Sequence, residues 1–159
     1  MLYSEEPPHA NTATQDEEAI QQRFESELTG DVKMTLVTHN PIGGLMIPGR
    51  ECPSCPTTQD LIGEVVALSS KIELEMVDFY RESEIANSLG VDKIPAVIVH
   101  NSDDSAAKFY GLPSGFEFPV LLDAIVAAST RISGLSEAAL AALAEVTEDV
   151  HIQVFVTPT

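Results

Sequence analysis

The stretch Cys52-Pro53-Ser54-Cys55 contains both cysteines of this 159-residue chain, and the rest of the sequence is best interpreted outward from it. Two thiols three positions apart on the first turn of a helix lie on one face and can close a disulfide. So short a loop would gain little from a structural disulfide, because the entropic benefit grows with loop length. The spacing therefore predicts chemistry at these two sulfur atoms.

The residues of the motif indicate how the pair would react. We expect Cys52 at the N-cap of the helix that follows, where free backbone N–H groups and the helix dipole favour a thiolate. Pro53 would occupy the first helical position, where its missing N–H has no partner to lose, and Ser54 would be a supporting donor. Cys52 is then the attacking cysteine, and Cys55, more buried on the next turn, resolves the mixed disulfide.

Two charged neighbours act on Cys52 in opposite directions. The carboxylate of Glu51 disfavours a thiolate, and the guanidinium of Arg50 partly offsets it. A helix N-terminus can lower a cysteine pKa from about 8.5 into the range of about 3.5–7.5. We therefore expect a modestly lowered pKa for the Cys52 thiol.

Away from the motif, hydrophobic periodicity divides the chain into alternating helices and strands. Residues 1–15 are expected to form a flexible tail. Helices are expected at 16–28, 52–70, 81–89 and 118–132, and strands at 32–38, 72–79, 96–99 and 106–111. The apolar run 96–99 is typical of a central strand that is buried on both faces. The order predicts a βαβ unit followed by a ββα unit, with the cysteines where the first strand meets the first long helix.

One segment of the chain is repeated near the C-terminus. Residues 145–154 repeat the pattern of 27–36, and each copy follows a helix-like segment. We therefore divide the chain into a folding unit at 16–133 and the first helix and strand of an incomplete second unit at 134–159. One helix and one strand bury too little surface to fold alone. Either the sequence belongs to a longer protein, or another chain covers the second strand, as in a homo-oligomer.

The composition argues against several classes of function. The net charge is −17, with 8 Lys and Arg against 25 Asp and Glu, which argues strongly against nucleic-acid binding. No run approaches about 18 consecutive apolar residues, so no membrane-spanning helix is expected. The acidic N-terminus lacks the pattern of a signal peptide, and a cytoplasmic location is the default expectation.

These features together resemble a known superfamily. Cys-x-x-Cys at a strand-to-helix junction, Lys93-Ile94-Pro95-Ala96 before a strand and Gly111 after the hairpin resemble the thioredoxin superfamily. The stretches 109–118 and 154–158 look like the glutaredoxin-like protein disulfide oxidoreductases, which carry two tandem thioredoxin-fold units, each with a Cys-x-x-Cys pair. The resemblance implies an α/β, thioredoxin-like fold, a mixed central sheet flanked by helices, with an extra N-terminal helix.

The resemblance also implies roles for individual residues. Cys52 matches the attacking cysteine of the family and Cys55 the resolving one. Pro95 matches the cis-proline that faces the active site, and Ile94 would pair backbone to backbone with a bound peptide. The family is reduced by NADPH-dependent thioredoxin-reductase-like flavoproteins, so such a flavoprotein is an expected partner besides protein disulfide and dithiol substrates. In two respects this sequence departs from the family: the loop at 40–51 is longer, and the second Cys pair is absent.

Three functions are compatible with the sequence. The first is a thiol–disulfide oxidoreductase whose Cys52–Cys55 pair is its redox centre, with no other cofactor. The second is an electron-relay or docking module for a flavoprotein reductase and peroxiredoxin system. The third is a dimeric iron–sulfur or metal-bridging protein, because zinc and iron–sulfur sites take four ligands and one chain offers a single Cys pair; no metal ligands are predicted within one chain. We expect His39 at the surface, and Asp78 as a solvated strand end rather than a proton relay.

Overall fold

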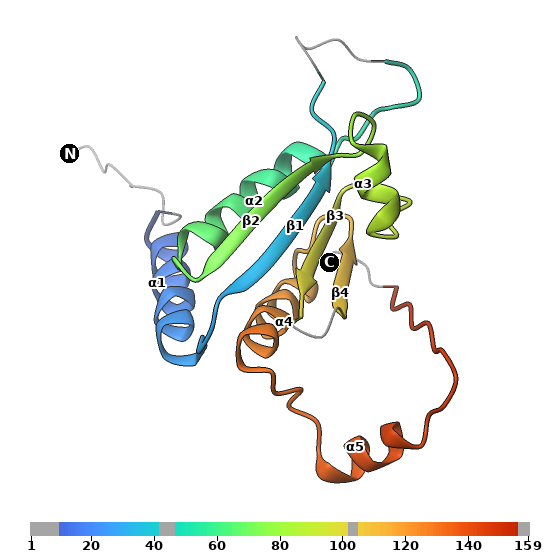
Figure 1. The fold of residues 1–159 in the computed structure, drawn as a ribbon. Coiled ribbons are helices and arrows are strands. Elements are labelled where there is room, and N and C mark those ends of the chain that lie inside the picture. Colours follow the sequence, from blue (N-terminus) through green and yellow to red (C-terminus); the bar gives the residue numbers. More distant parts are fainter. Residues whose placement is uncertain (1–9, 42–46, 102–104, 156–159) are drawn as a thin grey trace, which may run out of the picture.

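A mixed four-stranded sheet forms the centre of the part of the chain that the structure describes. The structure is a computed structural model, and it describes residues 10–41, 47–101 and 105–155. The strands are β1 (Val32–Thr38), β2 (Ile72–Asp78), β3 (Ala96–His100) and β4 (Ala106–Tyr110), in the order β2-β1-β3-β4 (Figure 1). β1 and β2 are parallel, whereas β3 is antiparallel to both β1 and β4. The α/β architecture predicted from the sequence is confirmed.

Helices cover both faces of this sheet. α1 (Ala10–Glu27), α2 (Cys55–Ala67) and α4 (Glu117–Thr130) contribute to the hydrophobic cluster on one face. The short α3 (Ser83–Ser88) contributes to a smaller cluster on the opposite face. Because α1 shares the larger cluster, the extra N-terminal helix is an integral part of the core.

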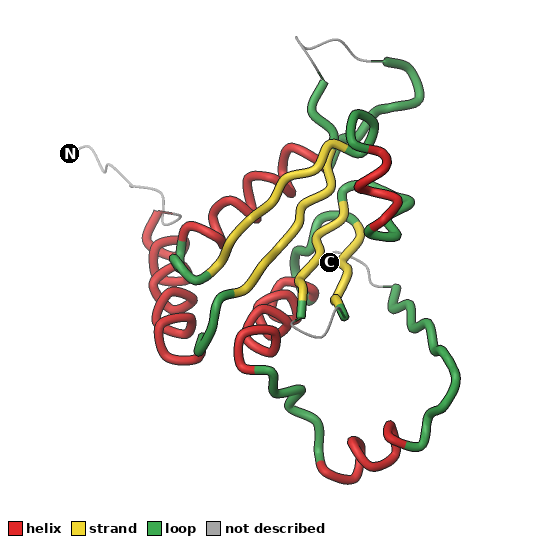
Figure 2. Tube along the Cα trace, in the orientation of Figure 1, coloured by secondary structure: helices red, strands yellow, loops and turns green. Residues whose placement is uncertain are grey.

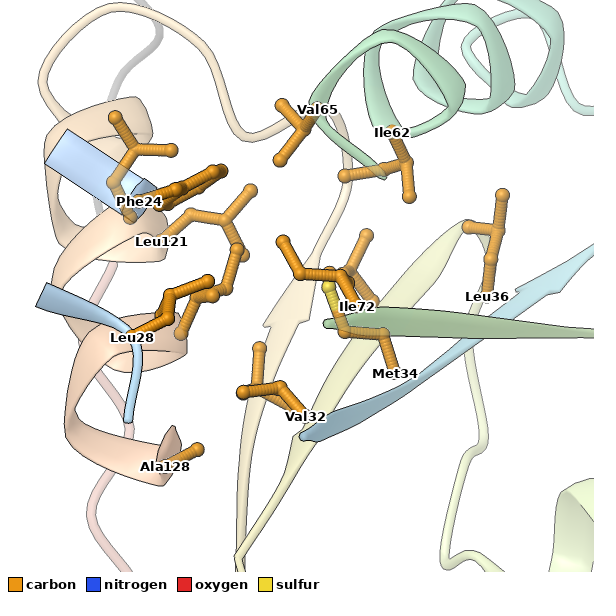
Figure 3. Close-up of a cluster of buried hydrophobic side chains, with 14 residues drawn as sticks. Phe24, Leu28, Val32, Met34, Leu36, Ile62, Val65, Ile72, Leu121 and Ala128 are labelled. Atoms are coloured by element: carbon orange, nitrogen blue, oxygen red, sulfur yellow. The ribbon is translucent and has the colours of Figure 1, made fainter. Parts of the chain in front are cut away.

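The alternation of side chains along β1 explains why this strand contributes to the hydrophobic clusters on both faces of the sheet. Successive residues of a strand point to opposite faces, and Val32 and Met34 belong to the larger cluster while Val37 belongs to the smaller one. In the larger cluster, Phe24 of α1 is fully buried and lies beside Leu121 of α4 (Figure 3). β1 is therefore a central strand, buried on both of its faces.

Two helix starts differ from those predicted by three residues or more. α1 begins at Ala10 instead of Asp16, so part of the predicted tail is helical, and residues 1–9 lie outside the described range. This start follows the pair Pro7-Pro8, which disfavours a helix that runs through it. α2 begins at Cys55 instead of Cys52, with consequences for the redox site that are described below. Residues 102–104 of the predicted hairpin turn lie outside the described residues.

In the C-terminal segment the structure describes a helix followed by an irregular stretch that ends at residue 155. α5 (Glu137–Ala144) has no buried residue and lies apart from the sheet (Figure 2). Residues 150–155 are irregular, and Val150, Ile152 and Val154 are 64%, 79% and 78% exposed. No strand in the described part of the chain pairs with residues 150–155. The division into one unit and the start of a second stays a prediction.

Candidate redox site

Cys52 and Cys55 form a disulfide at the start of α2. Their Cα atoms are 5.3 Å apart, a separation typical of disulfides. The side chain of Cys55 is fully buried, whereas Cys52 is partly exposed. The two sulfur atoms therefore differ in their access to a large substrate, and only Cys52 can be reached from outside.

The backbone around the pair corrects the predicted helix start. Ser54 instead of Cys52 is the N-cap of α2, and its side chain makes no capping hydrogen bond. Pro56, and not Pro53, lies in the first turn of the helix. The N–H of Cys55 donates to the carbonyl of Cys52 over 3.2 Å. Cys52 thus belongs to a turn before the helix, and the helix dipole acts on its sulfur from one turn away.

Residues from four segments meet at the edge of the sheet where β1 ends. Thr38, the last residue of β1, pairs with Asp78, the last residue of β2. Pro95 immediately precedes β3, which runs antiparallel to β1 and therefore begins at this same edge. The Ile94–Pro95 peptide bond is cis, and the carbonyl of Pro95 accepts a hydrogen bond from the N–H of Gly111 over 2.9 Å. The substrate-binding roles of Ile94 and Pro95 stay predictions.

Asp78 is the centre of a polar cluster at this edge, with only 5% of its side chain exposed. Its Oδ1 accepts the N–H groups of Tyr80 and Arg81 over 3.1 and 2.9 Å. Its Oδ2 lies 3.1 Å from the Arg81 guanidinium, 3.3 Å from Nδ1 of His39 and 3.3 Å from the N–H of Asn40.

These contacts decide the ionisation state of Asp78. Burial opposes ionisation, but the hydrogen bonds from the backbone and side chain of Arg81, with those of Asn40 and His39, hold the pKa of the carboxyl well below its usual range. Asp78 is therefore a buried structural anion at neutral pH, where the sequence predicts a solvated strand end. A carboxylate that stays ionised does not carry a proton, so the proton-relay alternative is not supported.

Tyr80 connects this cluster to the segment before the cysteines. The ring of Tyr80 meets the ring of His39 edge-on at 4.8 Å, and the guanidinium carbon of Arg50 lies 4.6 Å from the centroid of the Tyr80 ring. His39, predicted at the surface, has only 11% of its side chain exposed. The position of Tyr80 could not be predicted, because no sequence motif places a residue after β2 next to the cysteine loop.

A tight turn fixes the backbone just before Arg50. The N–H of Arg50 donates to the carbonyl of Ile47 over 3.0 Å, and Gly49 between them has φ +84°. Pro48 followed by a glycine with positive φ is typical of a type II turn. The N–H of Gly49 also donates to the Glu51 carboxylate over 2.9 Å. This end of the long loop at 40–51 is thus held in place, and residues 42–46 of it lie outside the described residues.

Two buried hydroxyl groups lie at the end of β1 and in the first half of α2. Thr38 ends β1, and Thr58 stands on the same face of α2 as Cys55. Neither Oγ1 atom has a hydrogen-bond partner among the described protein groups. An unpaired buried hydroxyl costs about 1–3 kcal/mol. No sequence motif marks these residues, and only the packing of α2 on β1 reveals them.

The described residues offer neither a metal-binding cluster nor a membrane-spanning helix. Within 10–41, 47–101 and 105–155, no group of three or more His, Cys, Asp or Glu side chains is arranged to hold a metal ion. None of the helices in those ranges is long and apolar enough to cross a bilayer.

Comparisons with known proteins place this geometry in context. Residues 45–118 match the family described as a thioredoxin domain. The structure of a protein disulfide oxidoreductase from Aeropyrum pernix K1 is similar with a TM-score of 0.75 and 19% identity, over 91% of this chain and 59% of that one. The alkylhydroperoxide reductase AhpF of Enterococcus faecalis V583 is similar with a TM-score of 0.63 and 20% identity, over 79% of this chain and 56% of that one. The comparison with curated proteins finds no match.

The similar structures cover only part of their own chains and share few identical residues with this one. The chain spans less than two thirds of the length of either similar protein, 59% and 56% respectively. At 19–20% identity the likeness concerns the fold. The chain therefore has a thioredoxin-like fold with an oxidised Cys-x-x-Cys pair, and its resemblance to the thioredoxin-fold disulfide oxidoreductases is confirmed at the level of the fold.

Proposed function

We propose that this chain is a thiol–disulfide oxidoreductase that exchanges its Cys52–Cys55 pair with protein substrates. The observation that carries the proposal is the disulfide itself, which joins a partly exposed sulfur to a fully buried one at the start of α2. The thioredoxin-domain match over residues 45–118 supports it. The pair carries two electrons between its dithiol and disulfide forms, so the proposed reaction needs no other cofactor.

The reaction in the reducing direction has two steps. The Cys52 thiolate attacks one sulfur of a substrate disulfide, and the other substrate sulfur leaves as a thiolate. The Cys55 thiol then loses its proton and attacks the Cys52 sulfur, which releases the second substrate thiolate and closes the Cys52–Cys55 disulfide. The substrate gains two electrons and the protein loses two. The same steps in reverse donate the disulfide to a dithiol substrate.

The division of roles between the cysteines can be tested with two variants. Cys52→Ser should abolish the reduction of insulin disulfides by the dithiol form, because the exposed nucleophile is lost. Cys55→Ser should instead accumulate a mixed disulfide through Cys52, which intact mass spectrometry detects as a covalent adduct. Reduction of insulin by Cys52→Ser at the rate of the unaltered protein would contradict the mechanism.

A reductase must return the oxidised pair to the dithiol form. We infer that an NADPH-dependent thioredoxin-reductase-like flavoprotein does this, and that Ile94 and Pro95, at the same sheet edge as the disulfide, contact the incoming protein. The inference is tested by following NADPH oxidation with such a flavoprotein, the oxidised chain and insulin together. Omission of the chain should stop the oxidation.

The likeness to AhpF favours a second candidate, an electron-relay module that serves one partner. A relay would show turnover with a single cognate reductase and peroxidase pair and none with insulin or other protein disulfides. A general oxidoreductase would reduce several unrelated disulfides. The redox potential of the Cys52–Cys55 couple then decides whether the protein works mainly as a reductant or as an oxidant.

A further inference from the structure

The inner side of the redox site contains two hydroxyl groups that the packing of the core does not explain. Thr38 and Thr58 are 2% and 0% exposed, and Oγ1 of each has no hydrogen-bond partner among the described protein groups. Buried side-chain polar atoms in folded proteins are nearly always paired. Exceptions to this rule tend to occur at functional sites. The two unpaired hydroxyls are therefore candidates for a role in the reaction of the cysteine pair.

Both hydroxyls lie where the start of α2 packs against the end of β1. The buried residues of α2 are Cys55, Thr58, Ile62 and Val65, and residues three apart on a helix are neighbours on its surface. Thr38 shares its face of β1 with the residues that pack against Ile62 and Val65, because strand side chains alternate with a period of two. A hydrogen bond of 3.1 Å from Asn40 to Gln59 joins the loop after β1 to the same turn of α2. Thr58 is therefore a neighbour of Cys55 on the buried face of α2, and Thr38 lies at the end of β1 on the face that α2 covers.

Cys55 needs such groups because its sulfur must become negatively charged in a buried place. The second step of the exchange requires the Cys55 thiolate, and a thiol in apolar surroundings resists ionisation. Asp78, the buried carboxylate at this edge, is already committed to Arg81, His39 and the backbone. Among the described residues, the hydroxyls of Thr38 and Thr58 are the buried side-chain donors that have no hydrogen-bond partner.

We propose that the hydroxyls of Thr38 and Thr58 donate hydrogen bonds to the Cys55 sulfur as it becomes a thiolate. This inference rests on the proposed function and assigns the groups that promote its second step. The Cys55 proton passes to water, the Cys55 thiolate gives an electron pair to the Cys52 sulfur, and the bond between Cys52 and the substrate sulfur breaks. The substrate sulfur leaves as a thiolate. Both hydroxyls keep their own protons and lower the pKa of the Cys55 thiol, because hydrogen bonds to a charged form favour it.

The two steps can be separated in a single experiment with the chromogenic disulfide DTNB. The reduced protein releases one thionitrobenzoate when Cys52 attacks and a second when Cys55 resolves the adduct, so stopped-flow absorbance shows two phases. Thr38→Val and Thr58→Val remove the hydroxyl and keep the branched shape. Each should leave the first phase unchanged, slow the second about tenfold at pH 7, and raise the pH midpoint of the second phase by about one pKa unit.

The controls separate a chemical role from a structural one. Thr38→Ser and Thr58→Ser keep the hydroxyl and should restore the second phase. Thr35→Val removes a buried threonine on the opposite face of β1, where its hydroxyl lies 2.8 Å from Nε2 of His100, and should leave both phases unchanged.

Each outcome bears on one of the two proposals. If the unaltered protein shows no second phase, the proposed function is wrong. If it shows both phases and the two Val variants resolve the adduct at the unaltered rate and pH midpoint, the role of the hydroxyls is wrong while the proposed function stands. Val variants that slow both phases equally, or Ser variants that restore nothing, would also overturn the inference, because they indicate a structural role.

Discussion

Substitution of Asp78 by Asn tests the claim that a buried, ionised carboxylate holds the edge of the sheet at the redox site. Asn has nearly the same shape but carries no charge, and its NH2 group must replace one of the two accepting oxygens. The less costly orientation keeps the oxygen that accepts the N–H groups of Tyr80 and Arg81. It turns the NH2 group toward the N–H of Asn40 and the Arg81 guanidinium, two donors that then lose their acceptor.

The expected loss of stability follows from these contacts. A hydrogen bond to a charged group contributes about 1.5–3 kcal/mol. The Arg81 side chain is 56% exposed, so solvent screening limits its share to about 1 kcal/mol or less. The bond from Asn40 is long, at 3.3 Å, and we take the lower end of the range for it. We therefore expect Asp78→Asn to lower the free energy of unfolding at pH 7 by about 2–3 kcal/mol.

The difference in stability between the unaltered protein and Asp78→Asn should also depend on pH. The pKa of Asp78 is lowered in the folded protein, so its contribution is fully present above the unfolded-state pKa of about 3.9 and is lost as the pH falls toward the folded-state value. The difference in stability between the unaltered protein and Asp78→Asn should therefore be constant from pH 7 to about pH 5 and shrink below about pH 4. The other carboxylates are common to both proteins, so the difference isolates Asp78.

Urea unfolding followed by circular dichroism at fixed ionic strength provides the measurement. Asp123→Asn is the matched control, because Asp123 also pairs with an arginine, Arg23 at 2.6 Å, but its side chain is 65% exposed. That control should lose less than about 1 kcal/mol. Equal losses in the two variants, or a difference that stays constant down to pH 3, would refute the reasoning.

Three further perturbations follow from the structure. Phe24→Ala should lower the free energy of unfolding by about 3–5 kcal/mol in urea titrations, because Phe24 is fully buried between α1 and α4. Gly63→Ala should raise it by about 0.5–1 kcal/mol, because Gly63 is exposed within α2 and an added Cβ would meet nothing within 4 Å; a loss of stability would contradict the geometry of that turn. Arg50→Gln should raise the pKa of the Cys52 thiol, because it removes a cation that Tyr80 holds close to the cysteine turn. Thiolate absorbance at 240 nm measures this pKa. The control Lys33→Gln, at the far end of β1, should leave it unchanged.

The four strands of the sheet could be predicted because their signals are local. The bounds of β1 follow from the alternation of Val32, Met34 and Leu36, and the continuous run at 96–99 indicates burial on both faces. The position of the reactive pair is local as well, since both thiols lie within four consecutive residues.

The start of α2 could not be predicted, because the sequence offers two equivalent choices. Pro53 and Pro56 are each suited to the first turn of a helix, where a missing N–H is tolerated. The chain uses Pro56, which places Ser54 at the N-cap and leaves Cys52 in the preceding turn. No local preference in the sequence distinguishes the two prolines.

The polar cluster around Asp78 depends on the register of β1 and β2, which is a property of the pair of strands. Asp78 lies beside Thr38 only because β1 and β2 are parallel and pair Val32 with Ile72. The same register brings His39 next to Asp78. A shift of the pairing by one residue would turn the side chains of a strand to the opposite face. Sequence periodicity indicates which face of the sheet a side chain occupies. The register with the partner strand determines which side chains lie next to it.

The repeated segment also shows that strand formation depends on partner strands, because its two copies have the same local sequence pattern. Residues 27–36 and 145–154 share one pattern, yet the first copy contains most of the central strand β1 and the second is irregular. β1 has β2 and β3 as hydrogen-bonded neighbours and helices or strand side chains against both faces. Residues 150–155 have no paired strand in the described part of the chain, so their amide and carbonyl groups gain nothing from an extended conformation over hydration. The apolar alternation at Val150, Ile152 and Val154 is therefore compatible with a strand, but the segment would form one only beside a neighbouring strand. The pattern alone does not order the segment.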